Sequence, residues 1–153
     1  MLRHIELFTG LSDADVAALV AVASRVTLEA GEMLFRIGDD AAYLYLVEAG
    51  QVALAMPITV GGHEEDVRID ERRAGQTLGW STLVPPHRFI LNATAPVASV
   101  LLAFPRASLL NYFAARPDVG YVVLRNVAAV VGERLQVFQA MWLRQMQHMV
   151  THV

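Results

Sequence analysis

Glycine interrupts the middle of the chain so regularly that it restricts this region to short strands joined by turns. Between Val26 and Pro105 the sequence consists of short apolar or alternating runs, each ended by glycine. Runs of roughly four to nine residues at such intervals are typical of a β-sandwich or a β-barrel. The glycines that divide them are Gly31, Gly38, Gly50, Gly61, Gly62, Gly75 and Gly79.

The best-defined pair of predicted strands is a hairpin in the first half of this region. Its strands are residues 43–49 and 51–60, and Gly50 lies between them. The Gly61-Gly62 turn then leads into an alternating strand over residues 66–72.

Helical periodicity appears at both ends of the chain. Ser12 is a predicted N-cap followed by early acidic residues and a short helix. After Pro105 the period of the apolar residues returns to that of a helix. The pattern predicts one helix over residues 106–116 and a long one from about residue 119 to residue 149.

Apolar residues of the long helix alternate in steps of four and three, which is a heptad pattern. We expect this row to meet a partner helix in a homodimer: Leu124, Ala128, Val131, Leu135, Phe138 and Trp142, with Gln145 and Met149 continuing it. A second row would pack on the β-domain: Val123, Val127, Val130, Val137 and Met141. The alternative is a helix that packs only on its own domain.

Composition favours a soluble protein with a subunit interface. Hydrophobic residues make up 55% of the chain and charged residues only 18%, and some of the apolar excess is expected to face a second subunit. No run is long enough to span a membrane, and the N-terminus lacks the apolar core of a signal peptide. We therefore expect a cytoplasmic protein without a membrane contact.

Charge and cysteine content exclude several further classes. The chain has no cysteine, so it forms no disulfide and no cysteine-ligated metal site. All twelve basic residues are arginine and the net charge is -3, which leaves no positive excess for binding a polyanion directly.

The glycine placement resembles the cyclic-nucleotide-binding domain of bacterial catabolite-activator-type regulators, kinase regulatory subunits and gated channels. The resemblance covers roughly residues 7–135 and rests on residues 31–39, 44–52 and 75–79. It implies a mainly β fold with flanking helices: an eight-stranded, jelly-roll-like double-stranded β-helix with an N-terminal helix and a long C-terminal dimerisation helix. We expect residues 1–116 to form the roll with its first helix, and residues 117–153 to form the long helix of the same domain.

In that family the ligand lies against a phosphate-binding cassette that opens with Gly-Glu and closes with an arginine. Gly79 matches the opening glycine, but Trp80 replaces the glutamate and Phe89 the arginine. Arg88 lies one residue early, and only a bulge would turn it into the site. The candidate pocket residues are Gly79, Trp80, Ser81, Thr82, Arg88, Phe89, Leu91 and Ala93.

Two interpretations of this degenerate cassette stay open. Trp80 and Phe89 either fill the pocket or line an apolar one beneath Pro85 and Pro86, or the chain binds cyclic AMP or cyclic GMP through unusual contacts. Backbone N–H groups near Ser81 would then serve an anion. No cofactor is specified beyond a cyclic nucleotide or another small ligand.

Other classes fit less well. A cupin-like metal enzyme needs clustered histidines, but only His63 and His87 lie within the predicted roll, each in a turn. His87 is alternatively a ligand contact or a surface residue. We expect neither a metal site nor catalysis.

The chain ends at Val153 without a helix-turn-helix segment after the long helix, so we expect a sensor or adaptor that signals by protein association and does not contact DNA directly.

Overall fold

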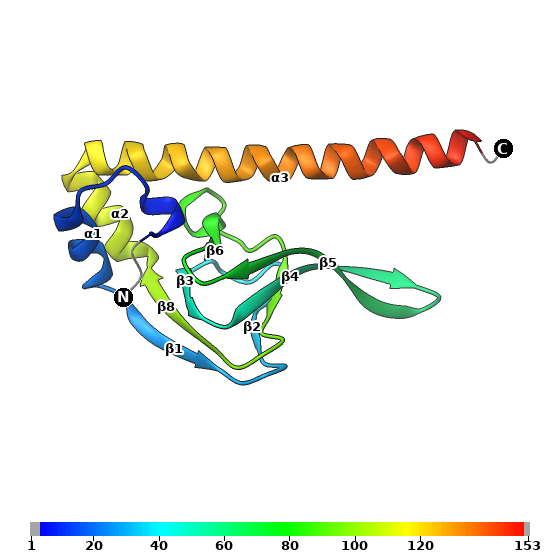
Figure 1. Ribbon diagram of the computed structural model, residues 1–153, viewed down its shortest axis with the longest axis horizontal. Coiled ribbons are helices and arrows are strands. Elements are labelled where there is room, and N and C mark those ends of the chain that lie inside the picture. Colours follow the sequence, from blue (N-terminus) through cyan, green and yellow to red (C-terminus); the bar gives the residue numbers. More distant parts are fainter. Residues whose placement is uncertain (1–3, 152–153) are drawn as a thin grey trace.

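The computed structural model describes residues 4–151 and contains the predicted eight strands in two antiparallel sheets (Figure 1). The strand order is β1-β8-β3-β6 in one sheet and β2-β7-β4-β5 in the other. The strands are β1 (Ser24–Leu28), β2 (Met33–Phe35), β3 (Tyr43–Ala49), β4 (Gln51–Val60), β5 (His63–Arg73), β6 (Thr77–Leu78), β7 (Asn92–Thr94) and β8 (Ser99–Pro105).

The predicted turns lie where the glycines put them. All seven glycines that divide the strands have positive φ, the conformation that only glycine adopts without strain. The hairpin of β3 and β4 has the predicted bounds. β5 is longer than predicted because its pairing with β4 continues to the turn, where Val60 lies opposite His63.

The helices flank the roll as the sequence indicated. They are η1 (Glu6–Phe8), α1 (Asp13–Val20), η2 (Trp80–Leu83), α2 (Arg106–Ala115) and α3 (Pro117–Thr151). Ser12 caps α1, since its hydroxyl oxygen accepts a hydrogen bond from the Asp15 N–H. α3 begins two residues earlier than predicted because Pro117, read as a break, occupies its first turn, where proline is tolerated.

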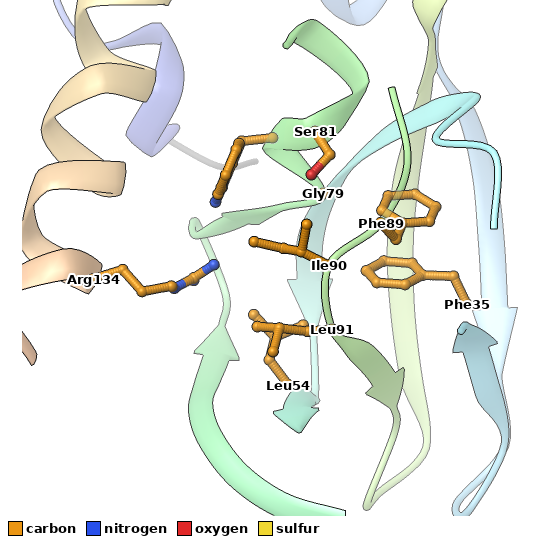
Figure 2. Close-up of a pocket in the computed structure, with 9 residues that line it drawn as sticks. Phe35, Leu54, Gly79, Ser81, Phe89, Ile90, Leu91 and Arg134 are labelled. Atoms are coloured by element: carbon orange, nitrogen blue, oxygen red, sulfur yellow. The ribbon is translucent and has the colours of Figure 1, made fainter. Parts of the chain in front are cut away.

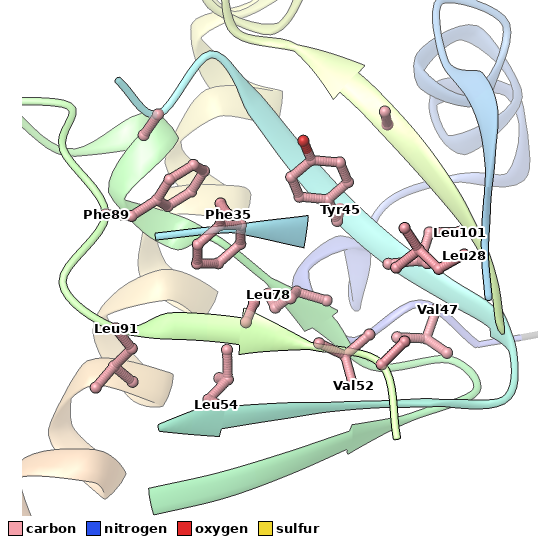
Figure 3. Packing of buried hydrophobic residues seen from close by; sticks show 14 residues of the cluster. Leu28, Phe35, Tyr45, Val47, Val52, Leu54, Leu78, Phe89, Leu91 and Leu101 are labelled. Atoms are coloured by element: carbon pink, nitrogen blue, oxygen red, sulfur yellow. The ribbon is translucent and has the colours of Figure 1, made fainter. Parts of the chain in front are cut away.

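The interior of the roll is a continuous apolar cluster between the two sheets (Figure 3). Several of its large members come from facing strands and from the segment before β7: Phe35, Tyr45, Leu54, Phe89 and Leu91. Burying one such side chain stabilises the fold by roughly 1.5–3 kcal/mol. The core therefore depends on residues that flank the cassette as well as on the strands.

A second cluster holds the helices against the outer face of the first sheet. Leu44, Leu46 and Phe104 of that sheet pack against η1, α1, α2 and the start of α3. Phe8 meets Phe104 edge to face, with ring centroids 5.5 Å apart. This cluster fixes the direction in which α3 leaves the roll.

Only the first part of α3 packs on the roll. Val123 and Val127 of the second predicted row are buried, whereas Val137 and Met141 further along are exposed. A helix of 35 residues is about 50 Å long. Figure 1 shows α3 continuing past the roll, on the same side as the projecting β4–β5 hairpin.

A buried arginine connects the N-terminal segment to the edge strand. The Arg72 side chain, 8% exposed, donates hydrogen bonds to Glu6 of η1, to Asp70 and to the Thr77 carbonyl. Asp70 in turn accepts from Arg134 of α3. This chain of ion pairs therefore joins η1, β5 and α3.

No helix between residues 4 and 151 combines the length and apolar content that a membrane crossing requires.

We predict that Arg72→Gln lowers the free energy of unfolding by about 1 to 3 kcal/mol, because Glu6 and the Thr77 carbonyl lose their donor while Asp70 keeps Arg134. Arg73→Gln is the matched control, since Arg73 is 70% exposed and pairs at the surface with Glu71; it should cost less than about 1 kcal/mol. Urea denaturation measures both values. Equal losses for the two variants would contradict a structural role for the Arg72 network.

Candidate functional site

The cassette loop begins at Gly79, which has φ of 81° and opens the η2 turn. A Cβ atom at this position would lie 3.0 Å from the Phe89 ring and 3.4 Å from the Tyr43 carbonyl. Glycine is thus required both for the backbone conformation and for the close approach of Phe89.

Phe89 lies inside the roll and stacks on Phe35. The ring centroids are 3.6 Å apart with an interplanar angle of 9°, and Phe89 is 5% exposed. Its backbone is fixed as well, because its N–H donates to the Asp39 carbonyl and its carbonyl accepts from the Gly38 N–H. The position that the resemblance assigns to an arginine therefore holds a core aromatic residue.

Trp80 lies outside the interior of the roll, unlike Phe89. It is half-buried and packs against the cluster that holds the helices, outside the stack of Phe35 and Phe89. Pro85 and Pro86, expected as a roof, are exposed. Trp80 therefore forms an outer wall of the pocket.

A small hollow remains beside these aromatic side chains (Figure 2). It is lined by Phe35, Leu54, Gly79, Trp80, Ser81, Phe89, Ile90, Leu91 and Arg134. Its free space is about 20 Å³, enough for about one water molecule. Sites for small organic ligands usually measure about 300–1,000 Å³. A nucleotide does not fit into this conformation.

The structure brings together five of the eight candidate pocket residues: Gly79, Trp80, Ser81, Phe89 and Leu91. The other three lie elsewhere. Thr82 is buried and its hydroxyl donates to the Tyr43 carbonyl, Arg88 is exposed and donates to the Gly38 carbonyl, and Ala93 lies in the core.

The neighbouring His87 lies outside the lining of the hollow. One ring nitrogen, Nδ1, lies 3.0 Å from the Thr82 carbonyl within the loop. Between residues 4 and 151 no three histidine, aspartate or glutamate side chains are placed to hold a metal ion.

Arg134 of α3 is a pocket residue that the sequence analysis missed. Among the nine lining residues it is the only charged one, and Figure 2 shows its guanidinium extending from α3 toward the hollow. The sequence did contain a signal. The row expected to face the roll runs 123, 127, 130, 137 and 141, and position 134 completes its alternation of four and three. A lone arginine in an apolar row indicates a specific partner or ligand.

The electrostatic surroundings of Arg134 are partly desolvated. Burial lowers the pKa of its guanidinium from the ordinary value, and the charge of Asp70 opposes part of that change. An arginine stays protonated under these conditions. The pocket therefore carries a fixed positive charge on the α3 side.

The residues predicted to form the dimer seam divide into two groups. Leu124, Ala128, Leu135 and Trp142 are exposed, and the last two are 57% and 62% exposed. Val131 and Phe138 are half-buried, and Val131 packs against the cluster that holds the helices. The exposed members thus continue onto the part of α3 that extends past the roll.

Comparison with known proteins gives a consistent family match. The sequence model of the cyclic nucleotide-binding domain matches residues 25–116, more than half of the chain. The crystal structure of the N-terminal domain of a transcriptional regulator from Streptomyces coelicolor A3(2) is 32% identical with a TM-score of 0.70, covering 86% of this chain and 92% of that one.

Two further relatives are larger than this chain. The catabolite activator protein of Thermus thermophilus is 27% identical with a TM-score of 0.73, over 93% of this chain and 63% of that one. Glutaminase 1 of Bradyrhizobium diazoefficiens is 25% identical over 134 residues, which are 88% of this chain. The chain spans about a fifth of the length of that curated relative, 21%.

We predict that Phe89→Ala lowers the free energy of unfolding by about 3 to 5 kcal/mol, because it removes one ring of a buried stack and leaves a cavity. Ile90→Ala is the control on the adjacent, exposed residue and should cost less than about 1 kcal/mol. Urea titrations followed by circular dichroism give both values. If Phe89→Ala were as stable as the native chain, Phe89 would not be part of the core.

Proposed function

Because the chain belongs to the cyclic nucleotide-binding domain family, we propose that it is a cytoplasmic sensor domain that does not bind cyclic AMP or cyclic GMP in the usual way and passes its state on through α3. The family and the fold are those of regulatory domains. In this proposal the chain catalyses no reaction, and its output is association with another protein.

The observation that carries this proposal is the stack of Phe89 on Phe35. It puts an apolar ring where the resemblance expects a cation, and Trp80 has an indole N–H but no acceptor for a ribose hydroxyl. Losing the buried partner of an ionised phosphate typically costs about 2 to 5 kcal/mol. The acceptor for the ribose hydroxyl and the cation for the phosphate are therefore both missing.

The proposed output rests on the part of α3 that extends past the roll. Six large apolar side chains are exposed there on one side of the helix: Leu135, Trp142, Leu143, Met146, Met149 and Val150. Single exposed apolar residues are ordinary, but a contiguous strip of them marks an interface. The heptad spacing favours a second copy of the same helix as partner.

The relatives are compatible with more than one kind of output. Two of them are by name a transcriptional regulator and a catabolite activator protein, and the third is a glutaminase in which the similar region makes up only part of the chain. We propose that the domain is a sensor in this protein, with α3 as the connection to the protein that it controls.

We predict that isothermal titration calorimetry with cyclic AMP or cyclic GMP gives a dissociation constant no tighter than about 100 μM. The reason is the filled position at Phe89 and the missing acceptor at Trp80. A submicromolar constant for either nucleotide would contradict the proposal, and it would favour the alternative of a genuine cyclic-nucleotide receptor with unusual contacts.

We predict that light scattering at micromolar concentration gives a mass twice the 16.8 kDa of one chain. Leu135→Asp should release monomers, because it puts a charge into the apolar seam of the helix pair. Gln136→Asp is the control, since it adds the same side chain to an exposed position of α3 outside the seam. A native mass of 16.8 kDa would show that the seam does not form a dimer.

A further inference from the structure

Arg134 places the positive charge of this pocket on the opposite side from the cation of the usual cassette. The family expects its cation in the loop that closes the cassette, but that position holds Phe89. Here the charge comes from α3, on the other side of the hollow (Figure 2). The Arg134 side chain is 12% exposed, so it is held close to the protein and does not extend into solvent.

Most of the hydrogen-bonding capacity of Arg134 is unused by the described part of the chain. A guanidinium has five N–H donors. The contacts among residues 4–151 use one terminal nitrogen, Nη2, which donates to Asp70 at 3.2 Å. None of its nitrogens is both buried and without a partner, so the nitrogens that make no hydrogen bond within residues 4–151 keep some contact with solvent.

Asp70 does not depend on Arg134 for its neutralisation. The same carboxylate oxygen, Oδ2, also accepts from Nη1 of the buried Arg72 at 3.2 Å. If Arg134 turned to another acceptor, Asp70 would keep this charged partner. Arg134 is therefore the member of the network that is available to a ligand.

We propose that the pocket binds a small amphipathic monoanion, whose acidic group pairs with Arg134 and whose apolar body lies against Trp80, Ile90 and Leu91. A carboxylate carries one charge and has acceptor geometry that matches a guanidinium. Glu6 and Asp70 balance Arg72 and Arg134, and only Arg134 can change partner because Asp70 keeps Arg72. The ligand therefore carries one charge, since a second negative charge would have no cation to pair with.

Entry of the ligand requires a movement of the pocket wall. The free space of about 20 Å³ is too small for an organic anion. Trp80 lines the hollow, is half-buried and lies outside the stack, so the proposal requires Trp80 to move while the contact between Phe35 and Phe89 is kept. The inference rests on the proposed function only in treating this hollow as the sensing site.

The test uses benzoate and hexanoate as probes, with benzamide as the uncharged match to benzoate. The native full chain is titrated, and the amide resonances of Trp80 and Ile90, which line the hollow, are followed in ¹H–¹⁵N spectra. We expect at least one of the two carboxylates to bind with a dissociation constant tighter than about 5 mM, and benzamide to bind about tenfold or more weakly than benzoate if benzoate is the ligand.

Variants then identify the cation. Arg134→Gln should raise the dissociation constant of the carboxylate about tenfold or more, and Arg134→Lys should restore part of the affinity. Arg144→Gln on the exposed part of α3 is the control and should leave the affinity unchanged. Thermal melts of all variants establish that they are folded.

The proposal fails if neither carboxylate binds within that range, if benzamide binds as well as benzoate, or if folded Arg134→Gln binds like the native chain. These outcomes do not test the proposed function, which is tested by the nucleotide titration and by the mass in solution. Conversely, a monomeric chain that binds benzoate through Arg134 would support the anion site and refute the dimer.

Discussion

The contact between Phe89 and Phe35 determines what this roll can hold. Two rings 3.6 Å apart fill the interior next to Gly79, and the glycine is required in part because Phe89 approaches it so closely. The core therefore extends through the place where a receptor for a phosphate would need water, charge and space. Because the core fills the inner side of the pocket, a ligand would contact mainly the outer wall, which is formed by Trp80 and by α3.

A second constraint connects this wall to the rest of the molecule. Arg134 of α3 and Arg72 of β5 share one carboxylate oxygen of Asp70, and Arg72 continues to Glu6 of η1. A change in the partner of Arg134 would alter how α3 is held against the β5 edge. Since the exposed apolar strip begins at Leu135, the next residue, the proposed sensing site and the proposed output are adjacent on one helix.

The fold was largely predictable because its signals are local. Glycines with positive φ fix the turns, and periodicity fixes the strands and helices, so the predictions for β5, α2 and α3 differ from the structure only at the ends of these elements. The site was less predictable because it depends on contacts between distant segments. Counting along the cassette placed Phe89 but could not show that Trp80 faces the helices. Arg134 was missed although it is the one charge in an otherwise apolar row, because the pairing with Asp70 becomes visible only once α3 is packed on β5.

The central claim is that the cassette belongs to the core and does not form a nucleotide site. The most direct measurement is a ¹H–¹⁵N correlation spectrum of the full chain, recorded with and without cyclic AMP in excess. We predict that the amide resonances of Gly79, Ser81, Phe89 and Leu91 do not shift, because their surroundings are already filled by protein. Saturable shifts of these four resonances, accompanied by loss of the ring-current shifts expected from the stack of Phe35 and Phe89, would contradict the claim.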